Sequence, residues 1–366
     1  MKAAPIAFFL PSLRGGGAQR VIVNLVQAIA ERGLPVDVIL AIAQGAFLDQ
    51  LPPSVRLVDL RATRLTGSLL PLTRYLRRER PRVLVSSMSH ANLIALWAAR
   101  LARQGTPVIV TVHTTLSHSM GQRERLGDRV WPHLVRLFYP WAAGVVAVSG
   151  GVADALAQST GISRARVQVV YNPVITPGMI ALGRQAPDHP WFGVGQPPVI
   201  LGVGRLTAAK DFPTLIRAFA EVRRHRAARL MILGEGEERP ALTALVGELG
   251  LADDVALPGF VEKAPAYMAG AALFVLSSAW EGLPTVLIEA LALGTRVVAT
   301  DCHSGPREIL QQGRLGALVP VGDPAALAQA IIDALDRPAE PIPAEALRPF
   351  TREAAVDHYL RLIESA

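Results

Sequence analysis

Short apolar runs alternate with segments of helical periodicity along the whole chain. In the first half, the apolar runs predict buried strands, and the segments between them have the spacing of amphipathic helices. The predicted strands are residues 6–10, 36–42, 55–59, 83–86, 108–112 and 144–148, and the predicted helices are residues 18–32, 68–79, 91–103 and 151–158. This alternation is typical of α/β layers built on parallel sheets.

The pattern stops at residues 175–198, which are rich in proline and glycine and lack periodicity. We expect this stretch to cross between domains 1–174 and 199–348, and the length of 366 residues also favours two domains. The alternation then restarts, with strands at 199–203, 229–233, 254–257, 272–276 and 296–299, helices at 212–224, 238–249, 284–293 and 324–335, and a final amphipathic helix at 351–364.

Charged residues follow two of the predicted strands in the second half. Arg205 and Lys210 come after the first of these strands, and Glu281 and Glu289, with seven residues between them, come after a later one. Pro284 suits the first turn of a helix, whose free N–H groups and positive dipole end attract anions. Cations for a diphosphate and carboxylates for sugar hydroxyls together favour a nucleotide-sugar site.

These residues belong to an ordered set of motifs. The chain resembles the retaining glycosyltransferases of the GT-B fold that share a Glu-x7-Glu signature, the family 4 or group 1 glycosyltransferases. The resemblance runs nearly end to end, in the family's order, over Gly15-Gly-Gly-Ala-Gln-Arg20, Val112-His113-Thr114, Tyr171-Asn172-Pro173, Gly202-Val-Gly204-Arg205, Gly234-Glu-Gly236, Leu257-Pro-Gly-Phe-Val261 and Ser277-Ser-Ala-Trp-Glu-Gly282. Each segment is weak alone, but their order makes chance an implausible explanation.

The resemblance implies a fold and a site. The fold is two facing Rossmann-like α/β domains with a cleft between them, the first for the acceptor and the second for the donor. The C-terminal helix, residues 351–366, is implied to pack back on the first domain. The implied catalytic residues are His113, Arg205, Lys210 and Glu281, and the implied donor-binding residues are Gly16, Gly17, Gly204, Arg205, Lys210, Phe260, Val261, Glu281, Gly282, Leu283, Pro284, Thr285 and Glu289.

Each implied role has a plainer alternative. The resemblance places Arg205 and Lys210 on the diphosphate, but two such cations are more often a surface pair. It places Glu281 and His113 against the transferred sugar, where a helix cap and a strand-end histidine are the alternatives. Glu289 is implied to bind the ribose hydroxyls, and a buried unpaired carboxylate is otherwise costly. The glycines at 15–17 form either a simple turn or a loop that approaches phosphate closely.

One segment departs from the common family pattern. Many members have two glycines and then a glutamate after the last donor-domain strand, whereas this chain has Asp301-Cys-His-Ser-Gly-Pro-Arg-Glu308. A Ser-Gly-Pro variant resembles the branch that builds lipopolysaccharide core, capsule or exopolysaccharide, often from UDP-sugars. The departure leaves the transferred sugar open and favours a UDP-sugar donor with a lipid-linked, lipopolysaccharide or polysaccharide acceptor.

The same residues indicate whether the protein needs a metal ion or a cofactor. The sequence contains no Asp-x-Asp, and two cations with a helix N-terminus suffice to neutralise a leaving diphosphate, so we expect metal-independent transfer without a cofactor. A dinucleotide oxidoreductase is disfavoured because the glycine motif at 202–204 stops after two glycines. Only Lys2, Lys210 and Lys263 could serve a pyridoxal-dependent phosphorylase. A non-catalytic subunit is disfavoured because Arg205, Lys210, Glu281 and Glu289 are all present. A GT-B-type UDP-sugar epimerase and a soluble-acceptor transferase remain alternatives.

Charge is unevenly distributed. Residues 1–196 carry 21 Lys+Arg against 9 Asp+Glu, and the remainder carries 16 against 21, which together give the net charge of +7. Arginines form two groups, at 74–82 and at 123–136, and the second group lies near Trp131, Phe138, Tyr139 and Trp141. They are either a solvated surface or an attachment surface for an anionic membrane that turns the cleft toward the bilayer. Nucleic acid is disfavoured because no stacking motif or reading helix stands out.

The remaining features concern location. The single cysteine, Cys302, excludes an internal disulfide and fits a reducing compartment. Residues 6–10 are bracketed by Pro5 and Pro11 and indicate a buried strand instead of a signal peptide. No smooth apolar span of about 20 residues is present. We expect a cytoplasmic protein, peripheral on the cytoplasmic face of the inner membrane.

Overall fold

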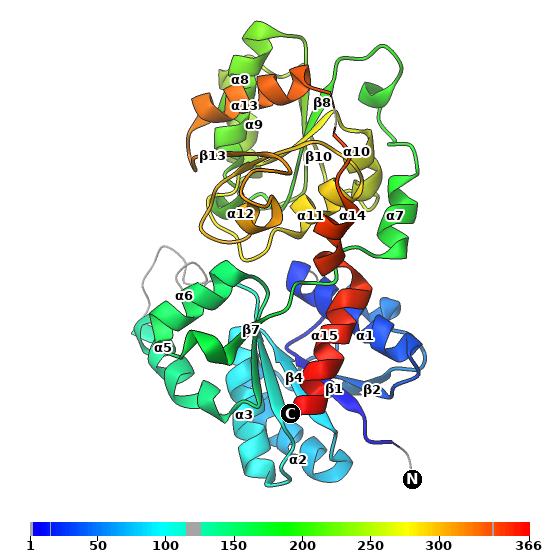
Figure 1. The fold of residues 1–366 in the computed structure, drawn as a ribbon, viewed down its shortest axis with the longest axis vertical. Helices are drawn as coiled ribbons and strands as arrows, with labels where there is room; N and C mark the ends of the chain where they lie inside the picture. Colours follow the sequence, from blue (N-terminus) through cyan, green and yellow to red (C-terminus); the bar gives the residue numbers. More distant parts are fainter. Residues whose placement is uncertain (1–2, 15, 115–125, 339) are drawn as a thin grey trace. The chain divides into compact units, whose positions relative to one another are not determined.

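The computed structural model describes residues 3–14, 16–114, 126–338 and 340–366. The chain forms two compact units, Met1–Val174 with Phe350–Ala366, and Ile175–Pro349 (Figure 1). Each unit is a parallel sheet covered by helices, which confirms the predicted α/β class. Within the described residues, no helix combines the length and apolar character needed to span a bilayer.

Seven strands in the described part of the first unit form one parallel sheet in the order β3-β2-β1-β4-β5-β6-β7. The strands are β1 Ile6–Leu10, β2 Val36–Leu40, β3 Arg56–Asp59, β4 Val83–Ser87, β5 Val108–Val112, β6 Gly144–Ala147 and β7 Val167–Val169. The main helices are α1 Gly17–Glu31, α2 Leu69–Glu79, α3 Ser89–Ala102, α5 Leu126–Phe138, α6 Gly150–Thr160 and α15 Arg352–Ser365, and a 3₁₀ helix, η3, covers Tyr139–Trp141. The chain order reverses between β1 and β4.

The described part of the second unit holds six parallel strands in the order β10-β9-β8-β11-β12-β13. They are β8 Val199–Val203, β9 Arg229–Leu233, β10 Val255–Gly259, β11 Leu273–Leu276, β12 Val297–Thr300 and β13 Ala317–Val319. The helices are α7 Pro177–Gly183, α8 Phe212–His225, α9 Arg239–Glu248, α10 Ala264–Gly270, α11 Thr285–Ala292, α12 Pro306–Ile309, α13 Pro324–Asp336 and α14 Ala344–Leu347, with a 3₁₀ turn, η6, at Ala208–Lys210. Here the chain order reverses between β8 and β11.

From the sequence, residues 175–198 were predicted to be a crossing between domains without periodic structure, and the structure differs. It contains α7 and belongs to the second unit. A Cβ on Gly183 would lie 2.2 Å from Leu293 Cδ2, so the glycine lets α7 pack directly beside the end of α11. The proline and glycine content of this stretch therefore goes with close packing and short elements.

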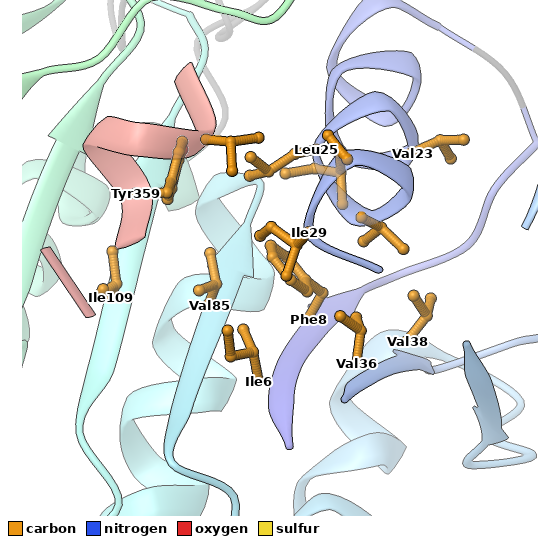
Figure 2. Packing of buried hydrophobic residues seen from close by; sticks show 14 of the residues in the cluster. Ile6, Phe8, Val23, Leu25, Ile29, Val36, Val38, Val85, Ile109 and Tyr359 are labelled. Carbon is orange, nitrogen blue, oxygen red and sulfur yellow. The ribbon is translucent and has the colours of Figure 1, made fainter. Parts of the chain in front are cut away.

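The core of the first unit lies between its sheet and the helices α1 and α15. Continuous buried strands such as β1 and β2, in which every residue is buried, are expected for a parallel sheet covered on both faces. Figure 2 shows Phe8, Leu25, Ile29 and Tyr359 filling this layer. The C-terminal helix is also held to α1 by ion pairs of Arg352 with Glu31 at 2.9 Å and of Arg32 with Asp357 at 2.7 Å.

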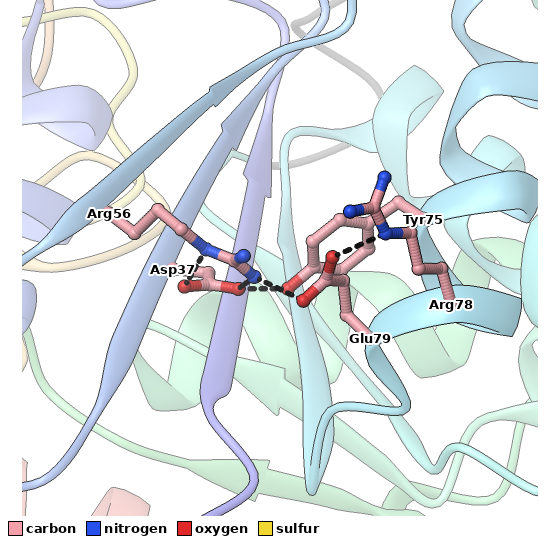
Figure 3. Close-up of polar contacts among 5 residues, drawn as sticks. All are labelled: Asp37, Arg56, Tyr75, Arg78 and Glu79. Carbon is pink, nitrogen blue, oxygen red and sulfur yellow. Dashed lines mark hydrogen bonds and ion pairs between the residues drawn. The ribbon is translucent and has the colours of Figure 1, made fainter. Parts of the chain in front are cut away.

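The opposite face of the first sheet contains a buried polar cluster. Asp37 of β2 is 3% exposed and lies between two core valines, so strand alternation directs it away from α1 and toward α2. Its carboxylate accepts hydrogen bonds from Arg56 of β3 and from the Tyr75 hydroxyl of α2, and Arg56 also contacts Glu79 at 2.9 Å (Figure 3). Burial and the bond to Asp37 raise the pKa of Tyr75. The cluster joins two strands to one helix.

Candidate functional site

The donor-side candidates lie at the reversal point of the second sheet. Arg205 and Lys210 follow β8, and Glu281 follows β11, its neighbour in the sheet. Since ligands of open parallel sheets bind beyond the carboxyl ends of the strands at such a point, the location suits a ligand site. Lys210 Nζ donates to Glu281 Oε1 at 2.5 Å, and both side chains are less than one-fifth exposed.

Hydroxyl groups hold this ion pair in place. Ser278 Oγ donates to Glu281 Oε1 at 2.7 Å, and Ser277 Oγ donates to the backbone carbonyl of Lys210 at 2.8 Å. Thr300 at the end of β12 bonds the carbonyl of Ser278 at 2.6 Å. These hydroxyl residues were not predicted as site components, although small hydroxyl residues directly after buried strands were a usable signal.

Arg205 differs from Lys210. It is exposed, and its guanidinium forms no hydrogen bond or ion pair with any residue that the structure describes. The two cations are thus not equivalent, because one is committed to Glu281 while the other extends into solvent. The prediction from sequence assigned both to the same diphosphate.

Close backbone approach explains the glycines between the cations. A Cβ on Gly204 would come within 2.9 Å of Lys210 Cε, so this position leaves room for the lysine stem to fold back. Gly234 has φ 143° and a Cβ there would meet the Gly204 carbonyl at 1.9 Å, while one on Gly236 would meet the Leu206 carbonyl at 2.2 Å. The Gly-x-Gly segment after β9 therefore packs directly on the loop that carries Arg205.

The turn after Glu281 is supported by the unusual loop at 301–308. Ser304 Oγ donates to the Gly282 carbonyl at 2.7 Å, and Gly305 has φ 96° with its missing Cβ facing the Pro284 ring. Burial raises the pKa of Cys302 to about 12, so this thiol stays protonated. The Ser-Gly-Pro variant thus shapes the turn that presents Glu281.

Several predicted donor residues surround this turn. Gly282, Leu283 and Pro284 are buried, and Thr285 begins α11. Pro284 was expected in the first helical turn, but it precedes the helix with extended ψ of 95°, and no side chain caps this helix end. Glu289 lies half-buried in α11 and interacts with neighbouring groups, so the cost of an unpaired buried carboxylate does not arise for it. Phe260, after β10, is 76% exposed beside the half-buried Val261.

The first unit places its own candidates at its own reversal point. Gly16 precedes α1 after β1 with φ 122°, a conformation that favours glycine. Gly17 has nothing within 4 Å of a Cβ, so packing alone does not require glycine there. Gly15 of the same loop lies outside the described residues, as do Arg123 and Arg125 of the second arginine group.

His113 follows β5, and a residue at the end of the neighbouring strand β4 holds its side chain. Its Nε2 lies 2.9 Å from Ser87 Oγ and 3.2 Å from Thr111 Oγ1. Thr111 donates its own proton to the Ser86 carbonyl, so it can only accept from His113, which favours a proton on Nε2. Nδ1 is then a bare acceptor, buried and without a partner among the described residues. Burial lowers the pKa of His113 to about 4.

This neutral histidine makes the first unit sensitive to acid. Because the folded pKa of about 4 lies below the ordinary 6.5, the unfolded state binds more protons between these values. Stability is therefore complete above about pH 6.5 and falls as the pH drops through this window, by up to about 3 kcal/mol. We expect His113→Gln to flatten the loss between pH 7.5 and 5, measured by urea unfolding. His133→Gln, on the exposed side of α5, is the control, and an unchanged pH dependence in His113→Gln would contradict the assignment.

Among the residues that the structure describes, no group of three or more His, Cys, Asp or Glu side chains could hold a metal ion. At the second sheet's reversal point the structure places the Lys210–Glu281 ion pair and, on the loop that leads to Lys210, the exposed Arg205. The arrangement can bind an anion and orient a hydroxyl-bearing ligand, since it offers a cation, a fixed carboxylate and an uncapped helix start.

Comparison with known proteins agrees with this chemistry. The family model described as Glycosyltransferase Family 4 matches residues 15–176, and the one described as Glycosyl transferases group 1 matches residues 197–337. The lipopolysaccharide core biosynthesis glycosyltransferase LpsE of Rhizobium meliloti is 31% identical over 363 residues, covering 96% of this chain and 97% of that protein.

Two further similarities cover nearly the whole chain. An N-acetylgalactosamine-N,N'-diacetylbacillosaminyl-diphospho-undecaprenol 4-alpha-N-acetylgalactosaminyltransferase of Campylobacter jejuni is 30% identical over 335 residues, covering 89% of this chain and 88% of that protein. The structure of Anabaena HepE in complex with UDP and glucose superposes with a TM-score of 0.79 at 23% identity, covering 99% of this chain and 100% of that chain, which shows a shared fold. The chain is therefore a GT-B glycosyltransferase and belongs to glycosyltransferase family 4, with a group 1 second domain.

Proposed function

We propose that the protein transfers a sugar, with retention, from a UDP-sugar to a hydroxyl of a lipid-linked, lipopolysaccharide or exopolysaccharide acceptor. The observation that carries the proposal is the Lys210–Glu281 pair at the reversal point of the second sheet, with exposed Arg205 on the loop that leads to Lys210. The names of its relatives support the acceptor class, because LpsE serves lipopolysaccharide core synthesis and the Campylobacter protein an undecaprenol-linked sugar. The UDP and glucose bound to HepE support the donor class.

In this proposal the second unit binds the donor. Arg205 pairs with the diphosphate as a planar fork, and Lys210 adds charge there while it holds Glu281 toward the transferred sugar. The uncapped start of α11 contributes backbone N–H groups, and Glu289 accepts from the ribose hydroxyls. Stabilisation of the leaving diphosphate then dominates catalysis without a metal ion or cofactor, and its departing oxygen accepts the proton of the acceptor hydroxyl.

In this proposal the first unit binds the acceptor and also supplies His113 and Gly17 to the donor. The unpartnered Nδ1 of His113 accepts a hydrogen bond from a hydroxyl of the transferred sugar. Gly17, where packing leaves space for a side chain, keeps the α1 N-terminus open to close approach by phosphate. The protein acts on the cytoplasmic face of the inner membrane as a peripheral enzyme.

A ligand panel tests the proposed donor. A ligand that binds only the native state raises apparent stability, so thermal shifts with UDP-, GDP- and ADP-sugars identify the cognate base. We expect the UDP-sugar to give the largest shift, unchanged by EDTA. A shift that disappears with the chelator and returns with magnesium or manganese would refute metal independence, and rapid conversion of the UDP-sugar without an acceptor would favour an epimerase.

Glu289 provides a separate test of the ribose contact. Glu289→Ala removes an acceptor used equally in the ground and transition states, so we expect UDP affinity to fall by about tenfold and turnover at saturating donor to change little. Calorimetry with UDP measures the affinity. Glu248→Ala, exposed on α9 of the same unit, is the matched control. Unchanged UDP affinity in Glu289→Ala would remove this residue from the site.

A further inference from the structure

An aromatic seam runs along the helices α3 and α5 and the 3₁₀ helix η3 of the first unit. It consists of His90, Trp97, Trp131, Phe138 and Trp141, whose ring centroids lie 4.4 Å apart for His90–Trp131, 5.2 Å for Trp97–Phe138, 5.1 Å for Trp97–Trp141 and 4.9 Å for Phe138–Trp141. Both α3 and α5 follow β-strands of the parallel sheet and lead back to the next one, so they run in the same direction. The seam therefore extends from the carboxyl end of the sheet to its amino end.

The seam is only partly covered. Trp97 and Trp141 are each 38% exposed, and Leu101, one turn after Trp97 on α3, is also 38% exposed. On α5, Val130 and Leu137 are 51% and 61% exposed, and their spacing of seven residues places them on one stripe of the helix. Exposed apolar side chains gathered in this way mark an interaction surface.

Positive charge surrounds the seam. The guanidinium of Arg100 lies 5.4 Å from the centre of the Trp141 ring, and exposed Arg103 ends the same helix. Both arginines, with Leu101 and Trp141, line an open groove of about 820 Å³. Within residues 83–114 and 130–153, whose side chains the structure describes, three arginines (Arg100, Arg103 and Arg136) stand against no acidic residue. A partner that carries negatively charged groups beside apolar groups suits this composition.

We infer that the aromatic seam, with Arg100 and Arg103, binds an anionic phospholipid bilayer. The inference rests on the proposed transfer to a lipid-linked acceptor, which gives the enzyme a reason to stay at a membrane. Tryptophan rings lie in the headgroup region of a bilayer, and arginines beside them pair with lipid phosphates, for which the groove provides space. A second copy is a poorer occupant, because a symmetric contact would bring the same arginines against each other.

This surface differs from the one expected from sequence. Of the arginines at 74–82, Arg77 donates to the Leu101 carbonyl at 2.8 Å and so joins α2 to the seam helix α3. Arg123 and Arg125 lie outside the described residues. Attachment is thus assigned to the helical layer of α3, α5 and η3, and the arginines of α2 only flank it.

Vesicle binding tests the inference. Wild type is compared with a seam variant, Trp97→Gln/Leu137→Gln/Trp141→Gln, and with a charge variant, Arg100→Gln/Arg103→Asn, by co-sedimentation with phosphatidylglycerol-containing and pure phosphatidylcholine vesicles. Asparagine is chosen because Arg103 has φ 55°. We expect wild type to prefer anionic vesicles, the seam variant to bind about tenfold less tightly, and each lost arginine to weaken binding about fivefold at low salt.

Matched controls replace side chains of the same kind elsewhere. Leu57→Gln/Leu249→Gln removes two other exposed leucines, and Arg14→Gln/Arg217→Gln removes two other exposed arginines. Quenching of tryptophan fluorescence by brominated lipids is a second readout. It should fall strongly in the seam variant, which loses Trp97 and Trp141 but keeps Trp131 of the seam, and Trp191 and Trp280 elsewhere. Equal binding to both vesicle types, wild-type binding by the seam variant, or a solution dimer that the seam variant dissociates would overturn the inference.

Donor hydrolysis separates this inference from the proposed function. Slow release of UDP from a UDP-sugar without acceptor should be the same in wild type and the seam variant, because none of the changed residues belongs to the candidate site. Hydrolysis retained with vesicle binding lost supports the inference. Wild type that binds anionic vesicles through the seam but processes no nucleotide sugar supports it too, and refutes the proposed transfer instead.

Discussion

Replacing Arg205 by alanine is expected to lower turnover about a hundredfold or more while leaving the fold as stable as in wild type. Loss of one preorganised donor to a developing negative charge costs about 2.7–4 kcal/mol in the transition state. The guanidinium has no ion pair with the described residues, so its removal leaves no buried partner uncompensated. Steady-state turnover with the UDP-sugar found in the ligand panel, and the unfolding midpoint, measure the two effects.

Lys210→Ala should behave differently, because Lys210 is the cation that compensates Glu281. The variant loses turnover and also about 1–3 kcal/mol of stability, since Glu281 is only 13% exposed and, of the described side chains, keeps Ser278 as its donor. Adding Glu281→Gln to Lys210→Ala should restore much of the stability and none of the activity. Comparison of the single and the double variant separates the contribution of Lys210 to stability from its proposed role at the diphosphate.

Arg217→Ala is the matched control, because Arg217 is an exposed arginine on α8 of the same unit. It should leave turnover unchanged. Near-normal turnover in Arg205→Ala would defeat the assignment of Arg205 to the leaving group. If Arg205→Ala and Lys210→Ala lost the same amount of stability, the ion pair of Lys210 with Glu281 would not make Lys210 more important for the fold than Arg205.

The sequence predicted the layers of the fold well, for a physical reason. Strands such as Ile6–Leu10 and Val108–Val112 are buried along their whole length, so they read as unbroken apolar runs. The strands at Val167–Val169 and Ala317–Val319 were missed because three residues are too few to show a period. Helix α5, which contains Pro132, was interpreted only as an arginine-rich surface.

The position of the candidate site could be predicted from the sequence, but which of its side chains contact one another could not. Residues after neighbouring parallel strands meet at one edge of a sheet, which explains why Arg205, Lys210 and Glu281 could be placed together. Nothing in a separation of 71 residues indicates which cation contacts the carboxylate. The supporting hydroxyls and the unpartnered Nδ1 of His113 are also properties of packing, and appear only once the strands are in register.

The largest effect on stability is expected outside the candidate site, at the buried polar cluster of Figure 3. Asp37→Ala leaves the buried Tyr75 hydroxyl without its acceptor and removes the main carboxylate partner of Arg56. Breaking a buried pair by removing one partner costs about 3–5 kcal/mol. We expect about 3 kcal/mol here, the lower end, because Arg56 is half exposed and keeps its bond to Glu79.

Variants that remove single groups measure how much individual bonds of this cluster contribute to stability. Tyr75→Phe removes only the hydroxyl, so it should cost about 1 kcal/mol, and the double variant with Asp37→Ala should cost less than the sum because the two changes break the same bond. Arg78→Ala, in an exposed pair with Glu79, should stay within about 0.5 kcal/mol of wild type. Urea unfolding gives the free energies, and hydrogen exchange in peptides from β2 and β3 assigns the loss to the first unit. If Asp37→Ala were as stable as Arg78→Ala, the cluster would not tie the edge of the first sheet to α2, and apolar packing alone would hold that edge.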